Sequence, residues 1–110
     1  MPAKYRKVTA IVRVDRLERV EKALQDLHVS GVSVSRVKGY GEYADFFARD
    51  WMSPYARVEI FTSEEHAERI SDAVLRAAST GTRGDGIVAV EAVDSVLRIR
   101  SNTPIATDEI

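Results

Sequence analysis

Residues 8–27, VTAIVRVDRLERVEKALQDL, decide the fold because two hydrophobic periods follow one another in them. Apolar or small residues occupy alternate positions from Val8 to Val14, which is the period of a β-strand. The apolar residues then recur at spacings of three and four from Leu17 to Leu27, which is the period of one helix face. Asp15 stands three positions before Glu18 and predicts the N-cap of this helix.

The rest of the chain repeats this order of strand and helix. Alternating valines mark a second strand that ends at Gly39. Thr62 and Glu65 predict the start of a second helix, whose apolar face runs from Ala67 to Ala77. Further strands are predicted at residues 56–61, 87–90 and 96–100. Two β-α-β halves predict an α+β fold of the ferredoxin-like β-α-β-β-α-β type, with one antiparallel sheet and two helices on one face.

Two segments lie outside this pattern. Residues 41–54 form a long connection between the halves, and a loop of this length in a compact domain is usually functional. Its aromatic residues are candidates for contact with a protein partner or for packing back on the domain, and they include Phe46, Phe47 and Trp51. Residues 101–110 show no period, and we expect a loose tail. The whole chain, residues 1–110, is expected to form a single domain.

The bulk composition excludes several classes of protein. Sixteen Lys and Arg nearly balance seventeen Asp and Glu, so the net charge of -1 argues against general nucleic-acid binding. The chain has no cysteine, which excludes disulfides and thiolate metal sites. No apolar run approaches the roughly 20 residues of a membrane span, so we expect no membrane insertion and a cytoplasmic location.

Three local patterns are candidates for ligand binding. Thr80-Gly81-Thr82-Arg83-Gly84-Asp85-Gly86 is a glycine-rich connection whose backbone N–H groups could converge on an anion, although such connections are also common as plain turns. Arg98 and Arg100 would share one face of a predicted strand, where they suit a polyphosphate or ion pairs with acidic residues. Lys38-Gly39-Tyr40-Gly41 permits a close backbone approach to a ligand or forms a bend.

Catalytic patterns are poor. His28 and His66 have neither a cysteine partner nor the spacing of metal ligands, and they fit surface positions on helices. No serine lies in the context of a nucleophile elbow. We therefore expect a protein that is not an enzyme, with no catalytic residue, no metal site and no tightly held cofactor.

Taken together, these blocks resemble the PII signal-transduction family over almost the whole chain. The resemblance rests on four segments in the family's order: residues 10–24, residues 29–41, the loop 80–86 and residues 96–100. It implies a homotrimer that binds an adenine nucleotide in each cleft between subunits. Gly84, Asp85 and Gly86 would hold the phosphates, Gly39, Tyr40 and Gly41 would line the cleft, Glu59 would lie near the adenine, and Arg98 and Arg100 would come from the neighbouring subunit.

The departures from the nitrogen-regulatory members concern residues that bind ligands in that family or carry charge there. Ile87 stands where those members carry a phosphate-binding lysine, and Ser79 stands where they carry another basic residue. Tyr43 replaces a glutamine that helps to bind magnesium and 2-oxoglutarate, and Tyr55 replaces a lysine. The loop from Gly41 to Trp51 instead resembles that of atypical PII-like proteins linked to carboxysomes or transporters. That likeness implies ADP or AMP in preference to ATP, bicarbonate as a further ligand, and a protein target contacted through the T-loop-like segment 41–54.

Alternatives remain open at this stage. An ATP-binding nitrogen-regulatory PII protein shares the same blocks. A metal-tolerance trimer shares the ferredoxin-like plan, but it calls for clustered His, Cys or carboxylates that the sequence does not show. An acylphosphatase-like enzyme needs an asparagine near an N-terminal phosphate loop, whereas Asn102 is the chain's one asparagine.

Overall fold

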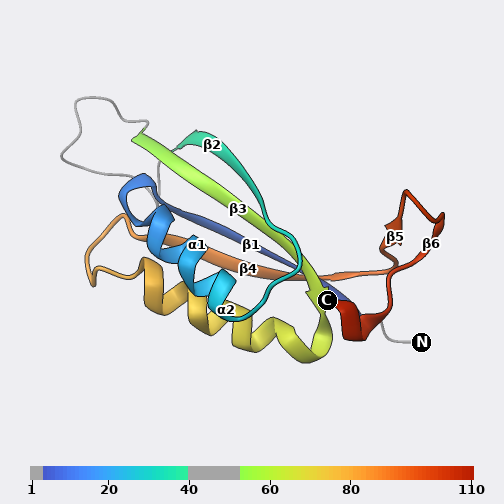
Figure 1. The fold of residues 1–110 in the computed structure, drawn as a ribbon. Coiled ribbons are helices and arrows are strands. Elements are labelled where there is room, and N and C mark those ends of the chain that lie inside the picture. The colour runs from blue at the N-terminus through green and yellow to red at the C-terminus, as the bar shows by residue number, and fades with distance from the viewer. Residues whose placement is uncertain (1–3, 40–52) are drawn as a thin grey trace.

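The computed structural model describes residues 4–39 and 53–110, and they form one four-stranded antiparallel sheet with two helices packed on one face (Figure 1). The elements are β1 (Tyr5–Arg13), η1 (Val14–Arg16), α1 (Leu17–Asp26), β2 (Ser33–Gly39), β3 (Ser53–Ser63), α2 (Glu64–Ala78) and β4 (Gly86–Val93). The strand order is β2-β3-β1-β4, with every neighbouring pair antiparallel. The α+β ferredoxin-like prediction is confirmed.

The core lies between the sheet and the helices. Alternate residues of β1 are fully buried there, beginning at Val8, and the matching face of β3 begins at Ala56. Val20 and Leu24 of α1 and Ile70 and Val74 of α2 cover them. Burying such aliphatic side chains stabilises the fold by roughly 1.5–3 kcal/mol each. The two periods in residues 8–27 are thus explained by one buried layer.

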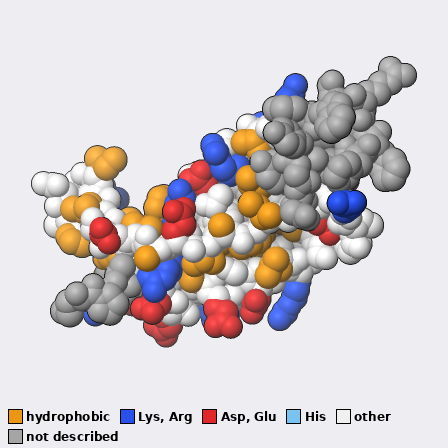
Figure 2. Space-filling model, turned by 180° about the vertical axis from the view of Figure 1, so that it is seen from behind, with side chains coloured by type: hydrophobic (Ala, Val, Ile, Leu, Met, Phe, Trp, Pro, Cys, Tyr) orange, Lys and Arg blue, Asp and Glu red, His pale blue; other side chains and the backbone are white. Residues whose placement is uncertain are grey.

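The other face of the sheet carries no helix in the described chain. Residues of β1, β3 and β4 that point away from the core gather here, including Ile11, Phe61 and Ile87. Phe61 is 45% exposed and Ile87 is 43% exposed. Viewed from behind, the molecule shows hydrophobic side chains along its middle with charged side chains around them (Figure 2). We call this surface the open sheet face.

Both helices begin differently from the capping predictions. Asp15 lies inside η1, and the residue before α1 is Arg16, which makes no capping hydrogen bond through its side chain. The α2 cap is Ser63, whose hydroxyl accepts a hydrogen bond from the N–H of His66 at 3.3 Å. Thr62 is buried instead and donates its hydroxyl to the carbonyl of Ile110. The predicted caps at Asp15 and Thr62 are therefore wrong.

The strand predicted at residues 96–100 is also wrong in extent. Only β5 (Leu97–Arg98) is extended, and it pairs with β6 (Thr103–Pro104) in a small separate hairpin. The chain turns between them, where Asn102 adopts a φ of 56° and donates its N–H to the carbonyl of Arg98 at 2.8 Å. Arg100 lies in this turn, so it does not share a strand face with Arg98.

The predicted loose tail is instead packed on the domain. After β6 the chain forms η2 (Thr107–Glu109). The carbonyl of Ile110 accepts hydrogen bonds from the backbone N–H of Ser63 and the hydroxyl of Thr62, and His66 Nδ1 lies 3.1 Å away. Tyr5 donates its hydroxyl to the carbonyl of Ile105 at 2.6 Å. These contacts tie the end of the chain to β1, β3 and the start of α2.

The predicted connection 41–54 overlaps β3, since Ser53 and Pro54 pair with Gly39 and Lys38. Tyr40, Gly41, Tyr43, Phe46, Phe47 and Trp51 lie outside the described residues. Within the part of the chain that the structure describes, no helix is long and apolar enough to cross a lipid bilayer.

Candidate functional site

The glycine-rich loop between α2 and β4, residues 80–86, is closed by one carboxylate. Asp85 accepts hydrogen bonds from the N–H of Thr80 at 2.8 Å and the N–H of Gly81 at 3.0 Å. It also accepts the hydroxyl of Thr80 and the Nε–H of Arg13, the latter at 3.1 Å. The side chain thus connects both ends of the loop and attaches it to the end of β1.

These bonds determine the charge of Asp85. Burial alone raises the pKa of its carboxyl, but the hydrogen bonds from Thr80, Arg13 and Gly81 outweigh burial and lower the pKa well below its ordinary value of 3.8. Asp85 is therefore ionised at neutral pH, and its negative charge repels a phosphate. If Asp85 contributes to an anion site, it does so through its backbone N–H rather than through its side chain.

Two more side chains hold the loop from the ends of neighbouring strands. Arg13 donates to the carbonyl of Arg83 at 2.6 Å and to the hydroxyl of Thr82 at 3.3 Å. Tyr55, which is only 1% exposed, donates its hydroxyl to the carbonyl of Gly84 at 2.7 Å. Arg13 and Tyr55 are directly opposite each other in the β1–β3 ladder, so both reach the loop from one place on the sheet.

Gly86 ends the loop where the chain passes close to β1. Its φ is 115°, and a Cβ at this position would lie 1.8 Å from the carbonyl oxygen of Ile11. Only glycine fits both conditions. Gly84 also has a positive φ, of 88°, which residues with a side chain rarely adopt. The glycines predicted to bind phosphate are therefore also needed for the shape of the loop.

A hollow of about 120 Å³ lies beside the loop. Ser79 and Ile87 both line it, together with Leu75 and Asp85. Ser79 and Ile87 are two of the three positions, with Tyr55, at which the resemblance described above implies a basic residue that this sequence lacks. The wall next to the loop is consequently apolar at Leu75 and Ile87, and neither Ser79 nor Ile87 can supply a positive charge.

Gly39 and Glu59, which are also predicted to belong to the site, lie in two different places on the sheet. Gly39 ends β2 and pairs with Ser53, so it lies at the same end of the sheet as Tyr55 and the loop. Glu59 lies near the middle of β3 on the open sheet face. Its carboxylate pairs with Arg57 at 3.1 Å and with Lys7 at 3.7 Å, and Lys7 also pairs with Glu91 at 3.6 Å.

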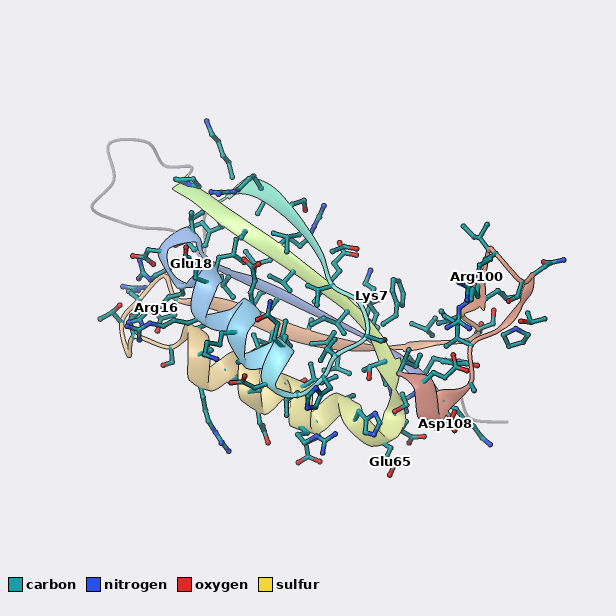
Figure 3. All side chains as sticks on the ribbon, viewed as in Figure 1. Lys7, Arg16, Glu18, Glu65, Arg100 and Asp108 are labelled. Atoms are coloured by element: carbon teal, nitrogen blue, oxygen red, sulfur yellow. The ribbon has the colours of Figure 1, made fainter. Side chains whose placement is uncertain are left out.

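Arg98 and Arg100 are remote from the loop in the same chain. Figure 1 shows the β5–β6 hairpin at the opposite end of the molecule from the connection between α2 and β4. Figure 3 shows Arg100 in that hairpin and Arg16 at the other end. Arg98 pairs with Glu109 of its own chain at 2.8 Å. The structure thus places Gly39 and the loop 80–86 at the same end of the sheet but on its two opposite edges, with β3 and β1 between them, and it places the two arginines at the other end.

Sequence reasoning missed Arg13 and Tyr55 as parts of this site. Their contacts in the loop lie 72 and 29 residues away along the chain, so no local sequence pattern predicts these contacts. The one available signal was Thr80 and Asp85 at the two ends of a glycine-rich segment. Both residue types commonly hydrogen-bond to nearby backbone in turns.

Comparisons with known proteins agree with this architecture. The sequence profile of the family described as nitrogen regulatory protein P-II matches residues 5–103. A nitrogen regulatory protein P-II of Rhizobium meliloti is 33% identical over 104 residues, covering 87% of this chain and 92% of the relative. That of Synechocystis sp. is 35% identical over 103 residues, covering 87% and 92%. The crystal structure of Arabidopsis thaliana PII bound to citrate superposes with a TM-score of 0.81 at 33% identity, covering 93% of this chain and 89% of that one.

Proposed function

Because the chain belongs to the nitrogen regulatory protein P-II family, we propose that it is a non-enzymatic regulator that binds an adenine nucleotide between the subunits of a homotrimer. One observation carries this proposal. The loop 80–86 and the pair Arg98 and Arg100 lie at opposite ends of one chain (Figures 1 and 3). A phosphate site that uses both therefore needs the loop of one subunit and the arginines of the next.

The open sheet face supports the assembly. Phe61 and Ile87 leave a large part of their side chains exposed on it. The charged groups of this face are already paired within the chain, since Glu59 binds both Lys7 and Arg57. Pairing lowers the cost of removing these charges from water, so the face can be covered by further copies. We expect a trimer in sedimentation or in mass measurement at native conditions.

A mixed-subunit experiment tests the shared site. Arg83→Glu places a negative charge in the loop, and the double variant Arg98→Gln with Arg100→Gln removes the arginines. Each variant alone should lose ADP binding. A trimer that contains both kinds of subunit has one cleft in which an intact loop faces intact arginines, so mixing them after partial unfolding should restore part of the binding. No recovery in verified mixed trimers contradicts a site shared between subunits.

We further propose that the site prefers ADP or AMP to ATP. The hollow beside the loop is lined by Ser79 and Ile87 in place of two basic side chains, so the charge of a third phosphate is poorly compensated. Calorimetric titration with AMP, ADP and magnesium ATP checks this order of affinity. Tighter binding of ATP contradicts it and favours an ATP-binding nitrogen-regulatory protein.

Bicarbonate is the proposed second ligand, since guanidinium groups such as those of Arg98 and Arg100 bind small oxyanions through paired N–H donors. Its addition should raise the affinity for AMP or ADP relative to chloride at the same pH and ionic strength. An unchanged affinity removes bicarbonate from the proposal.

The metal-tolerance alternative gains no support from the described residues. Across residues 4–39 and 53–110, no group of three or more His, Cys, Asp or Glu is placed to hold a metal ion.

The regulated target is proposed to be a protein, such as a transporter or a carboxysome component, that contacts the T-loop-like segment 41–54. The residues proposed for this contact are Phe46, Phe47 and Trp51, because aromatic side chains anchor protein interfaces. Phe47→Ala and Trp51→Ala should each weaken capture of the target while the nucleotide affinity stays the same. Capture that is independent of both substitutions and of ADP argues against this contact. A cytoplasmic location is part of the same proposal.

A further inference from the structure

We propose that Tyr55 and Arg13 are positioning residues, which hold the peptide groups of the loop 80–86 in the orientation that binds a phosphate. This inference rests on the proposed nucleotide site and adds to it two side chains that do not themselves need to touch the ligand.

The geometry fixes two successive peptide planes. Arg13 holds the carbonyl of Arg83 at 2.6 Å, and Tyr55 holds the carbonyl of Gly84 at 2.7 Å. None of the described peptide bonds is cis. In a planar trans peptide the C=O and the following N–H point in opposite directions. Holding these two carbonyls therefore directs the N–H groups of Gly84 and Asp85 away from Arg13 and Tyr55.

Orientation matters here because the loop is rich in glycine. A peptide group that precedes or follows glycine can turn over at little steric cost, which would exchange an N–H donor for a carbonyl acceptor. A carbonyl facing a phosphate repels it, whereas an N–H attracts it. The Tyr55 hydroxyl and the Arg13 guanidinium each stabilise one of the two orientations, so the loop is organised before the ligand arrives.

The side chains of Tyr55 and Arg13 are each held in place by their surroundings. The Tyr55 side chain is buried, and Gly84 is buried as well, so the loss of the hydroxyl leaves a carbonyl without a donor away from water. Arg13 is held by the Asp85 carboxylate at 3.1 Å while it reaches the Arg83 carbonyl. The inference concerns phosphate groups alone, because these peptide groups would meet the phosphates rather than the adenine.

Because only phosphate binding should be affected, a test can distinguish the positioning role from a general loss of stability, which would weaken the binding of every ligand. In Tyr55→Phe, we expect the affinity for ADP to fall about tenfold, while the affinity for adenosine, measured by ligand-observed NMR, stays within about twofold. Ser71→Ala is the matched control, since it removes a hydroxyl that donates to a backbone carbonyl, that of Ala67 at 2.8 Å, within α2. It should leave both affinities unchanged.

Arg13→Lys and Arg13→Gln form the second pair of variants. Lysine keeps the charge but cannot reach three acceptors in a fork, so we expect an intermediate loss of ADP binding for Lys and a larger loss for Gln. If Tyr55→Phe does not fold, the two Arg13 variants test the positioning role instead. If the folded variants bind ADP and adenosine with the same ratio of affinities as the wild type, whether or not both affinities fall, the positioning role is wrong but the proposed nucleotide site is not. A wild-type trimer that binds none of AMP, ADP and ATP overturns the proposed nucleotide site itself.

Discussion

The guanidinium of Arg98 lies 2.8 Å from the carboxylate of Glu109 in the same chain. Arg98 is one of the two arginines proposed to reach the phosphates bound by a neighbouring subunit. Glu109 follows the hairpin that carries Arg98, in the final turn η2. In the proposed site, the carboxylate of Glu109 would therefore compete with the phosphate for the guanidinium of Arg98.

Glu109→Gln should raise the affinity for ADP by up to about fivefold, because an exposed ion pair of this kind contributes about 0.2–1 kcal/mol. The free energy of unfolding should change by less than about 1 kcal/mol for the same reason. Asp108→Asn is the control, since it changes the net charge equally at the neighbouring position. Titration calorimetry at low and high salt checks the result. Equal gains in both variants would assign the effect to net charge alone.

The bonding of Asp85 predicts a dependence of stability on pH. The pKa of this carboxyl is lower in the folded chain than its ordinary value of 3.8, which we take for the unfolded chain. Its contribution is therefore complete above the unfolded pKa, and it is lost as the pH falls through the folded-state pKa. Asp85→Asn should destabilise the protein by about 1–3 kcal/mol at pH 7, and the difference from wild type should shrink below about pH 4.

Urea unfolding at a fixed protein concentration, repeated from pH 7 down to pH 2.5, measures this difference. Asp26→Asn is the comparison, because Asp26 makes an exposed pair with Lys22 at 3.4 Å. Its effect should stay within about 0.5 kcal/mol at every pH. A gap between wild type and Asp85→Asn that is constant with pH contradicts the assigned ionisation.

Much of the fold could be predicted from hydrophobic period. The apolar positions of residues 8–27 point to the core because a strand and a helix must bury one face each. The strand predicted at residues 96–100 is too long for a physical reason. Its alternating pattern resembles a strand, but residues 99–102 form the turn of a short hairpin in which Leu97 and Arg98 pair with Pro104 and Thr103, so the ladder ends at Arg98. The prediction of a loose tail is wrong because most contacts of residues 101–110 are made through backbone groups, such as the backbone oxygen of Ile110. Side-chain patterns in the sequence do not reveal contacts of this kind.

The site was predictable only in part. The loop 80–86 was found because glycines mark a backbone that adopts unusual angles, and three of them do have positive φ. The bonds that give the loop its shape depend on Arg13 and Tyr55, which the β1–β3 ladder brings opposite each other. Such partners become visible only when the register of the strands is known.

The corrected helix starts lead to a third prediction. Ser63→Ala should destabilise the protein by about 1 kcal/mol, because the hydroxyl of Ser63 caps the N–H of His66. Asp15→Ala should change the free energy of unfolding by less than about 0.5 kcal/mol, because α1 begins after Arg16 without a side-chain cap. Paired urea titrations distinguish the two. A larger loss for Asp15 than for Ser63 would restore the cap inferred from the sequence.

The last prediction concerns Gly86. In Gly86→Ala the new Cβ would lie 1.8 Å from the carbonyl oxygen of Ile11, and the φ of 115° is itself unfavourable for alanine. β4 must move away from β1, so we expect a loss of more than about 3 kcal/mol or no folded protein. Gly81→Ala should cost only about 1–2 kcal/mol, because its φ is 77° but no atom lies within 4 Å of a Cβ there.

Gly31→Ala completes the series, since a Cβ at Gly31 also meets nothing within 4 Å and no positive φ is involved. Its expected effect is within about 0.5 kcal/mol of zero or slightly stabilising, because alanine restricts the unfolded chain. We expect the loss of stability, measured by thermal and urea unfolding, to decrease in the order Gly86, Gly81 and Gly31. The difference between Gly86 and Gly81 measures the effect of the close approach to β1, and the difference between Gly81 and Gly31 measures the effect of the positive φ. If Gly86→Ala is no worse than Gly81→Ala, then β4 does not approach β1 as closely at this point as the structure shows.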